Sequence, residues 1–534
     1  MGTSTSNEAK DYFKKLKVNQ YILDDKADLC MDLAFKKTEA NKRKEWLKNY
    51  NEDEILDYNK KETNINDFIN LEFKHFSNSD NLRSIGSCID GLKVSQRKIL
   101  FSCFKRKLYN EIRVAQLSGY VSEHASYHHG EASLQGAIIG MAQDYVGSNN
   151  INLLQPNGQF GTRIMGGSDS ASARYIHTHL NPLIDYIFPS DDFPLLDYIN
   201  DDGIMVEPKW YCPIIPMVLI NGMVGIGTGF STNIPQFNPK ECCDNIKRKI
   251  NGEPYLSMMP YYKGFKGRIS KETTKGITKF ITRGKYTIKD EYVTITELPI
   301  GKWTNDFKEY IENILQLDDP WILDYENHST DKTVKFVLKL SDETLFDNQY
   351  KTNNIIEEKL KLTSNKNISN LHLYSKDGNI KKYETIYQIL DDHYYVRLNM
   401  YQARKDYQLD KLDNEIRHYE AKMRFIEYVI EEKVKVYKQS KLKIIESLRK
   451  YEFPFYEEGL IKEYDKHADI KLQYNYLLNL SIYNFTLEKV EELENNIEDK
   501  KQKYDILEKT DIKDIWINEL DIFEEEYNNW LKFK

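Results

Sequence analysis

The sequence predicts a multidomain α+β protein that ends in a long antiparallel coiled coil. Its 534 residues suffice for three or four domains, at about 150 residues each. Twelve of the 25 glycines and many short apolar runs fall between about 85 and 217, which is typical of mixed α/β structure with functional turns. Glycine and proline then almost vanish between Tyr395 and Pro454, where apolar residues follow a heptad spacing that indicates paired helices.

The first region, residues 1–80, is charged and only weakly periodic, and we expect helices joined by linkers there. Beyond the glycine-rich region, residues 218–395 contain alternating runs such as Tyr292–Thr296 and Val334–Leu338, bounded by glycine and proline. Alternation of apolar and polar residues predicts strands with one buried face. We therefore expect this third region to be an α+β domain with antiparallel strands.

The last region contains two heptad seams, Leu409–Ile430 and Val490–Leu507. We expect a first helix over roughly Tyr395–Tyr451, paired antiparallel with a second helix across a small globular head around Pro454–Ile482. The alternative is a helical bundle buried on the protein's own body.

Charge is distributed unevenly along the chain. The net charge is −8, from 75 basic and 83 acidic residues, yet Arg83–Arg113 holds eight basic residues against two acidic ones, a local balance of +6. From Ser481 onward there are 8 lysines and 15 acidic residues, a balance of −7. Because nucleic-acid binding follows the local field, the basic segment is a candidate phosphate-binding surface despite the net acidity.

Two further observations exclude other classes of protein. No stretch approaches the ~20 consecutive apolar residues of a membrane span, and the N-terminus lacks a signal-peptide pattern, so we expect no membrane partner. The six cysteines include the adjacent pair Cys242-Cys243 but no C-x-x-C spacing. This argues against a zinc site and a disulfide framework, and predicts reduced thiols.

A glycine-rich segment, Gln155–Thr178, leads to the pair Arg174-Tyr175. A phenol with an ordinary pKa of about 10 is a poor nucleophile at neutral pH. A neighbouring guanidinium favours the phenolate and can stabilise charge that develops on a phosphate under attack. Tyr175 is therefore a candidate nucleophile and Arg174 its partner, although each of the 38 tyrosines, taken alone, is more often structural.

The run Tyr127-His128-His129-Gly130-Glu131 combines two histidines with a carboxylate. A metal site is disfavoured, because neighbouring residues of a strand point to opposite faces and no third ligand lies nearby. A helix is predicted to begin at Glu131, where His129, the Ser133 hydroxyl and free amides can meet an anion. The alternative is a hydrogen-bonded pair of structural histidines.

The segment NGMVGIGTGF surrounds Ile226 with glycines. It lacks both the lysine of a P-loop and the downstream acid of a dinucleotide-binding fold, which argues against a nucleotide site. Ile226 is instead a candidate apolar wedge that enters between base steps and bends a duplex. A tight structural turn is the alternative on these residues alone.

Taken together, these segments resemble eukaryotic-type DNA topoisomerase II, a type IIA topoisomerase. The resemblance extends in order over nearly the whole chain and includes long, specific stretches. These are Ser77–Ile85, Asp90–Lys98, Tyr127–Leu134, Gly147–Arg163, Ala171–Thr178, Glu207–Gly222, Gly225–Gly229 and Ile295–Thr304.

The resemblance implies a role for each matching position. Tyr175 would attack a DNA phosphate to leave a 5′-phosphotyrosyl link and a free 3′ hydroxyl, with Arg174 stabilising the transition state. Two subunits would cut the two strands with a four-base stagger. Ile226 would be the intercalating wedge. The scissile and adjacent phosphates would be lined by Arg83, Lys93, Arg97 and His129, and further DNA contacts would come from Lys36, Lys37, Tyr127, His128, Ser133 and Trp303.

The resemblance also implies a domain order and an assembly. Residues 1–84 would be a Toprim tail and helical linker, 85–213 a winged-helix domain, 214–394 a tower domain, and 395–534 the coiled coil with a C-terminal dimerisation gate, the C-gate. The enzyme would act on double-stranded DNA as a homodimer, through the C-gate and the winged-helix region. We expect a nuclear location if the source is eukaryotic, with a viral or organellar setting as the alternative.

The cofactors implied by the resemblance are Mg²⁺ and ATP. The sequence shows neither the ATPase domain nor the acidic Toprim residues that bind magnesium, so we expect these ligands outside this chain and no metal bound by its residues. ATP-dependent passage of a second duplex, with its changes in supercoiling and catenation, would belong to the complete enzyme. We expect the chain alone to bind and bend DNA but to cleave it poorly.

One local departure from the family pattern and two rival functions remain. Ser168 and Ser170 stand where many relatives have a basic residue and an alanine, which either weakens DNA affinity modestly or leaves cleavage unaltered. The first rival function is a DNA-clamping architectural module without catalysis, in which Tyr175 is inert. The second is a structural coiled-coil dimerisation protein.

Overall fold

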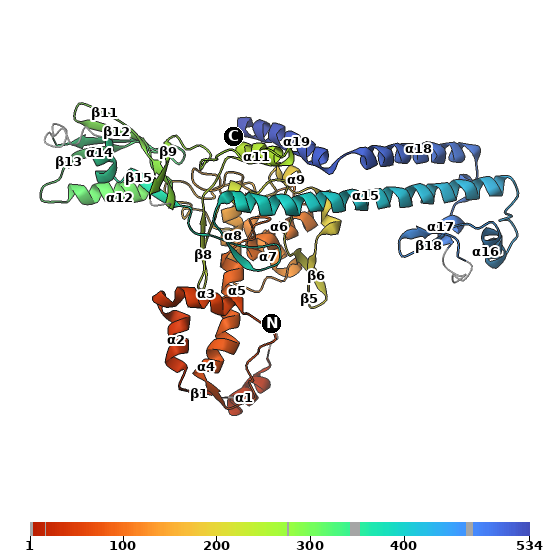
Figure 1. Cartoon of the computed structure of the whole chain (residues 1–534), viewed down its shortest axis with the longest axis horizontal. Helices are drawn as coiled ribbons and strands as arrows, with labels where there is room; N and C mark the ends of the chain where they lie inside the picture. Colours follow the sequence, from red (N-terminus) through yellow and green to blue (C-terminus); the bar gives the residue numbers. More distant parts are fainter. Residues whose placement is uncertain (1–3, 17, 275–276, 342–352, 466–473, 534) are drawn as a thin grey trace. The chain divides into compact units, whose positions relative to one another are not determined.

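The structure, a computed structural model, describes residues 4–16, 18–274, 277–341, 353–465 and 474–533 (Figure 1). The chain divides into two compact units. One comprises Met1–Arg397 together with Leu520–Lys534, and the other Leu398–Glu519. Among the described residues, no helix is both long and apolar enough to cross a membrane.

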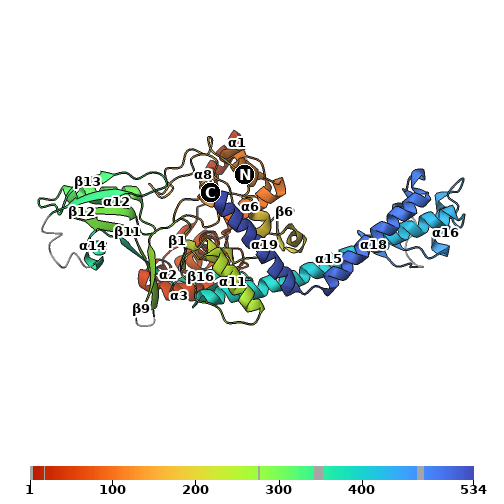
Figure 2. The ribbon, with the colours of Figure 1, turned by 90° about the horizontal axis from the view of Figure 1, so that it is seen from above.

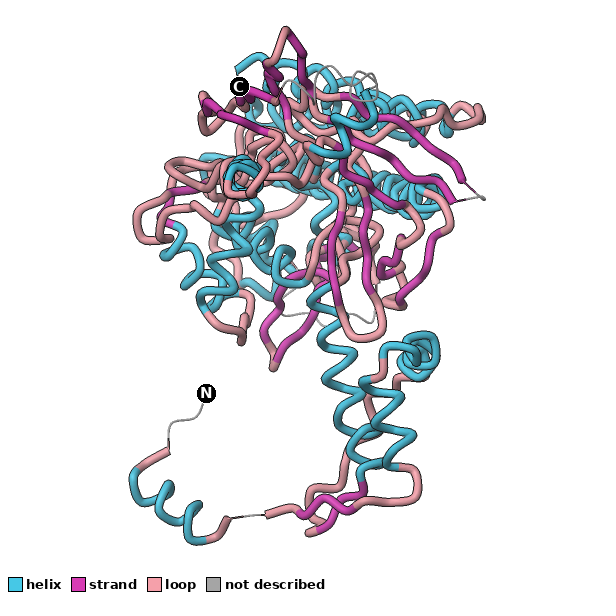
Figure 3. The backbone as a smooth tube through the Cα atoms, turned by 90° about the vertical axis from the view of Figure 1, so that its left-hand side faces the viewer, coloured by secondary structure: helices cyan, strands magenta, loops and turns pink. Residues whose placement is uncertain are grey.

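Residues 4–84 form the helices that the sequence predicts, with one short pair of strands (Figure 3). The strands β1 (Gln20–Ile22) and β2 (Glu62–Asn64) pair in parallel, and no sequence pattern predicts them because three residues are too few to show a period. The helical elements are α1 (Ser6–Lys14), α2 (Ala27–Phe35), η1 (Lys37–Glu39), α3 (Ala40–Lys48), α4 (Ile65–Phe68), η2 (Ile69–Phe73) and α5 (Lys74–Ser84).

The glycine-rich region is mixed α/β structure, as predicted. Its helices α6 (Val94–Arg106), α7 (Val114–His124) and α8 (Glu131–Ala142) contact one another through fully buried apolar side chains such as Leu117 and Ile138. Short antiparallel pairs join β3 (Ile112–Arg113) to β4 (His177–Thr178), β5 (Tyr198–Asp201) to β6 (Ile204–Pro208), and β7 (Met223–Ile226) to β8 (Ser231–Ile234). Shorter helices are α9 (Ile184–Ile187), η3 (Ser190–Leu195) and α10 (Met217–Ile220). All six cysteines are buried free thiols.

The third region contains the predicted antiparallel sheets (Figure 2). One has the order β15 (Thr363–Asn367), β10 (Ile277–Arg283), β9 (Arg268–Thr274). The other has the order β11 (Lys285–Lys289), β12 (Tyr292–Glu297), β14 (Phe336–Leu340), β13 (Ile322–Asn327). Also present are α11 (Pro239–Ile250), α12 (Thr304–Leu315), α14 (Asn353–Lys359) and the hairpin of β16 (Leu371–Tyr374) and β17 (Ile380–Tyr383). The predicted strand Val334–Leu338 begins two residues later, because the carbonyl of Lys335 closes a loop by accepting the His328 N–H.

The long helix α15 (Ile386–Ile430) begins and ends earlier than predicted. It does not reach Tyr451, because Glu432 takes a left-handed φ of 57° and the buried Val434 returns its N–H to the carbonyl of Tyr428. The Ser440 hydroxyl then caps a separate helix, α16 (Lys441–Lys450). The heptad spacing ends at Ile430, so the sequence did contain the correct boundary.

Within the unit Leu398–Glu519, α15 pairs with α18 (Leu487–Lys509) in the predicted antiparallel sense. Lys405 donates to the carbonyl of Glu508, while Glu415 and Glu420 form ion pairs with Lys500 and Lys501. A small apolar head follows α15 and includes the buried Phe425, Leu448 and Phe453. Its other elements are β18 (Phe455–Glu457), β19 (Leu460–Lys462), α17 (Asn475–Leu478) and η4 (Ile482–Asn484), and the last helix of the chain is α19 (Ile512–Phe533).

Candidate nucleic-acid interface

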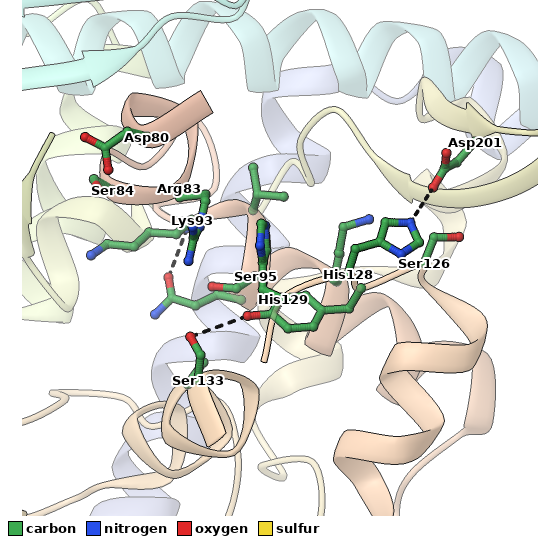
Figure 4. A pocket seen from close by; sticks show the side chains of 15 residues that line it. Asp80, Arg83, Ser84, Lys93, Ser95, Ser126, His128, His129, Ser133 and Asp201 are labelled. Atoms are coloured by element: carbon green, nitrogen blue, oxygen red, sulfur yellow. Dashed lines mark hydrogen bonds and ion pairs between the residues drawn. The ribbon is translucent and has the colours of Figure 1, made fainter. Parts of the chain in front are cut away.

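Six of the predicted site residues line one cavity, although they come from separate parts of the sequence. The cavity has a volume of about 610 Å³ and lies between α5, the beginning of α6 and the beginning of α8 (Figure 4). The predicted residues that line it are Arg83, Lys93, Tyr127, His128, His129 and Ser133. In the described part of the chain, neither Arg83 nor Lys93 forms an ion pair with a carboxylate, so both cations are available to an anion.

Lys93 is fixed at the entry to α6. Its N–H donates to Gln96 Oε1 at 2.9 Å, and its Nζ donates to the carbonyl of Val224 at 3.0 Å. Burial lowers the pKa of the Lys93 ammonium below its usual value. The lysine therefore sits in a partly desolvated place, where a phosphate would be attracted more strongly than in open water.

His129 precedes α8, which begins at Glu131 as predicted. Desolvation lowers the pKa of the His129 imidazole, and the Arg83 guanidinium lowers it further. The ring packs edge-on against Tyr127, at 5.3 Å between centroids, and the Tyr127 hydroxyl donates to Ser133 Oγ at 3.5 Å. A neutral imidazole in this position can exchange hydrogen bonds with a ligand without adding another charge.

Two carboxylates also line the cavity, and neither was predicted from the sequence. Asp80 Oδ2 accepts from the Thr228 hydroxyl at 2.9 Å, and Asp201 Oδ2 lies 3.9 Å from His128 Nε2. Among the described residues, no group of three or more histidine, cysteine, aspartate or glutamate side chains could hold a metal ion. The described residues therefore do not fit the Mg²⁺ that the resemblance implies.

Arg97, predicted from the resemblance as a phosphate contact, is paired with a carboxylate in the structure. Its guanidinium is 6% exposed and donates to both oxygens of Asp90, at 2.7 and 3.1 Å, and to the carbonyl of Leu92 at 3.0 Å. The neighbouring Lys98 is likewise engaged, because its Nζ lies 2.8 Å from Glu207. The local charge of +6 thus overstates the number of cations that are free to meet a ligand.

Arg174 and Tyr175 do not line this cavity, but both are exposed, and the Tyr175 side chain is 77% exposed. The loop is held at the beginning of α7, where the N–H groups of Val114 and Ala115 donate to the carbonyls of Ile176 and Ala173 at 3.0 Å. Because Ala173 and Ile176 are buried on either side, the fold presents the Arg-Tyr pair to solvent on a fixed backbone.

The glycine-rich segment before Tyr175 packs against Trp303. A Cβ on Gly166 would lie 2.3 Å from the indole, so only glycine allows this approach. Trp303 also meets Tyr145 edge-on, at 5.8 Å between ring centroids. Trp303, which the sequence predicts as a DNA contact, is thus half-buried beneath the loop. Ser168 is exposed and donates its hydroxyl to the carbonyl of Met165 at 2.8 Å.

The hairpin of β7 and β8 carries Ile226, which is 82% exposed. Val224 is 66% exposed and lies two residues earlier on the same face of β7. Figure 1 shows the hairpin extending toward α3 and α5. We did not predict from the sequence that Val224 would be exposed beside Ile226. The alternation of Val224, Gly225 and Ile226 nevertheless indicates that Val224 and Ile226 lie on one face of a strand. The hairpin therefore presents two apolar side chains.

Lys36 and Lys37 lie in the first region, apart from the cavity lining. Lys36 forms an exposed ion pair with Asp32 at 2.6 Å, and Lys37 is exposed. Arg43 donates to the carbonyl of Lys36 at 3.0 Å and lies beside Gly229, at the end of the hairpin loop. The buried Arg43 therefore connects the hairpin loop with the backbone at Lys36.

Open cations next to exposed apolar side chains are typical of proteins that bind and bend duplex nucleic acid. Comparison with known families identifies the family within this class of DNA-binding proteins. Residues 83–521 match the family model for the A subunit of DNA gyrase/topoisomerase IV, and residues 1–81 match that of the C-terminal associated domain of TOPRIM. The chain therefore belongs to the type IIA DNA topoisomerases, as its predicted resemblance indicated.

Individual relatives support this placement. The chain is 43% identical to DNA topoisomerase 2 of Arabidopsis thaliana over 98% of its length, and 40% identical to that of Saccharomyces cerevisiae over its full length. It spans 38% and 40% of the length of these relatives. The solved DNA-binding, cleavage and re-ligation domain of Plasmodium falciparum topoisomerase II is similar, with a TM-score of 0.83 and 38% identity, over 99% of this chain and 74% of that one. This match confirms the predicted α+β fold class.

Proposed function

We propose that this chain is the part of a type II DNA topoisomerase that cuts and reseals double-stranded DNA. The observation that carries the proposal is the convergence of Arg83, Lys93 and His129 on one cavity, directly beside the hairpin that bears Ile226. Phosphate-binding cations next to an apolar wedge are suited to a duplex that must be both held and bent.

Tyr175 is the proposed nucleophile. Its phenolic oxygen attacks a backbone phosphorus, the bond from phosphorus to the 3′ oxygen breaks, and the proton lost by the phenol is balanced by one gained at the 3′ hydroxyl. One ester replaces another, so the cut strand keeps the free energy needed for resealing. Arg174 stabilises charge on the phosphate, while the cavity cations hold the scissile and adjacent phosphates.

The remaining predicted DNA contacts differ in how well their surroundings suit the role. Tyr127, His128 and Ser133 line the cavity, and Lys36 and Lys37 are exposed. Arg97 and Trp303 are better assigned as supports, since one is closed in an ion pair and the other packs under the tyrosine loop.

The proposed domains are 1–84, a Toprim tail and helical linker; 85–213, a winged-helix domain; 214–394, a tower; and 395–534, the coiled coil and C-gate. The proposed homodimer contact at the C-gate is supported by exposed apolar side chains around an apolar cavity of about 220 Å³ in the head. They include Tyr437, Ile482 and Leu487, as well as Tyr483 at 86% exposure. A second contact would involve the winged-helix region.

The cofactors and location follow from the family rather than from a site in this chain. Mg²⁺ and ATP would be bound by Toprim and ATPase modules that act with these residues. A nuclear location is proposed, with an organellar one as the competing case, because one relative, 40% identical, is a mitochondrial DNA topoisomerase 2 of Dictyostelium discoideum.

The test is covalent capture. The chain, fused to a Toprim module, is incubated with supercoiled DNA and Mg²⁺ and then denatured, and protein-linked linear DNA is measured. We expect linkage that disappears in Tyr175→Phe and persists in Tyr186→Phe, a control in the same region whose side chain is also exposed. Linkage in both variants would mean that a different tyrosine is the nucleophile. Linkage in neither the unchanged chain nor the two variants would favour the DNA-clamping module in which Tyr175 is inert.

A further inference from the structure

The hairpin that carries Ile226 is fastened to the helix that carries Arg83. The Thr228 hydroxyl donates to Asp80 Oδ2 at 2.9 Å, and Asn81 Nδ2 donates to the carbonyl of Thr228 at 3.0 Å. Asp80 and Asn81 both belong to α5. Two polar contacts to a single residue thus connect the loop of the hairpin with the last turns of this helix.

Close packing reinforces these contacts. A Cβ on Gly225 would lie 1.9 Å from the carbonyl oxygen of Ser84, so the hairpin backbone touches the end of α5. Phe230, just beyond the loop, is buried with Leu47 and Ile85. Because polar contacts reach α5 and apolar contacts reach Leu47 and Ile85 beside it, the hairpin cannot swing away from the helix without losing several interactions at once.

The helix α5 also carries a phosphate-binding group. Arg83 lies three residues after Asp80, which places the two side chains on one face of the helix, and both line the cavity (Figure 4). The hairpin is also held by Lys93, which donates to the carbonyl of Val224 on β7. The hairpin that carries the apolar wedge therefore contacts both elements that carry the open cations, α5 and the beginning of α6.

We propose that Thr228, Asp80 and Asn81 are positioning residues that couple wedge insertion by Ile226 to phosphate binding at Arg83. Opening a base step costs stacking energy. A loose hairpin would yield to the stacked bases, whereas a hairpin fixed to the phosphate-binding helix directs binding energy into the bend. This inference rests on the proposed function, because it assumes that Ile226 enters the duplex.

The experiment separates bending from binding in the full chain. A short duplex labelled at its two ends reports bending by energy transfer at saturating protein, and fluorescence anisotropy reports affinity. Thr228→Val removes the hydroxyl but keeps the branched shape. We expect the equilibrium between bent and straight duplex to shift toward straight by about threefold to tenfold, as for the loss of a typical hydrogen bond. Affinity and melting temperature should stay close to those of the unchanged chain.

Two matched variants identify the cause. Thr228→Ser keeps the hydroxyl and should restore bending. Thr232→Val makes the same chemical change on β8 of this hairpin, at a buried threonine whose hydroxyl has no partner in the described structure, and should leave bending unchanged. In an Ile226→Ala background, Thr228→Val should cause no further loss, because the coupled group is already absent.

The outcomes also separate this inference from the proposed function. If the Ile226→Ala variant no longer bends the duplex while the Thr228→Val variant bends it like the unchanged chain, the proposed coupling is wrong. The proposed role of Ile226 as a wedge is then retained. If Thr228→Val loses bending only together with a large fall in melting temperature, its role is structural and the inference fails. If Ile226→Ala bends normally, the wedge itself is wrong, and the coupling fails with it.

Discussion

The cationic cavity and the paired helices α15 and α18 contain the same kinds of charged residue but use them in opposite ways. Between the helices, Lys500 Nζ lies 2.6 Å from Glu415, and Lys501 Nζ lies 2.7 Å from Glu420. In the cavity, Arg83 and Lys93 are left without a carboxylate partner in the described structure. Charged side chains that form ion pairs with one another contribute to the fold, whereas cations without a carboxylate partner can bind a ligand.

The same distinction divides the basic segment itself. Arg97 and Lys98 lie within 15 residues of Arg83 and contribute equally to the local charge. Arg97 is paired with Asp90 and does not line the cavity, whereas Lys98 lines it but is paired with Glu207, so only part of the segment offers unpaired cations to a ligand. A count of charges along the sequence locates the basic segment but cannot distinguish its paired cations from its unpaired ones.

The strongest test of this comparison is Arg97→Ala. Removing one partner of a buried ion pair leaves Asp90 charged and uncompensated, and such changes cost about 3–5 kcal/mol. We expect the free energy of unfolding of the complete chain to fall by that amount in urea titrations. Arg83→Ala should lower it by less than about 0.5 kcal/mol, as is usual for surface changes. If both variants lost the same free energy of unfolding, paired and unpaired cations would not differ in their contribution to stability.

Local motifs explain which parts of the site could be predicted. Tyr175, Ile226 and the start of α8 at Glu131 each carry their signal within a few neighbouring residues, and in the structure Tyr175 and Ile226 are exposed and α8 begins at Glu131. The heptad seams likewise predicted the antiparallel helix pair, because their period is a property of the sequence itself.

Contacts between distant residues explain what could not be predicted. Lys93 reaches a carbonyl 131 residues away at Val224, and Asp80 reaches Thr228 across 148 residues. No short pattern records such pairings. The burial of Arg97 has the same origin, since the Tyr211 N–H also donates to Asp90 and closes the pair from another part of the chain.

The open cations should act on DNA binding instead of stability. Arg83→Ala removes one proposed phosphate contact, and we expect the affinity of the chain for duplex DNA to fall by about fivefold to tenfold. The slope of log affinity against log salt should decrease by about one unit, because one fewer counterion is released. Titrations at several salt concentrations measure both quantities. An unchanged slope would show that Arg83 does not meet a phosphate, whatever happens to the affinity.

The smallest effect is expected where cations are already paired, between the long helices. Lys500 and Glu415 are both partly exposed, so their attraction is screened and opposed by the entropy of two long side chains. A double-mutant cycle with Lys500→Ala and Glu415→Ala should give a coupling energy of about 0.5 kcal/mol in urea unfolding, with no change in duplex affinity. A weak coupling energy would be consistent with many ion pairs that each contribute little free energy and together set the register of the two helices. If Lys500→Ala lowered duplex affinity, the paired cations would also serve DNA, and the contrast with the cavity would no longer hold.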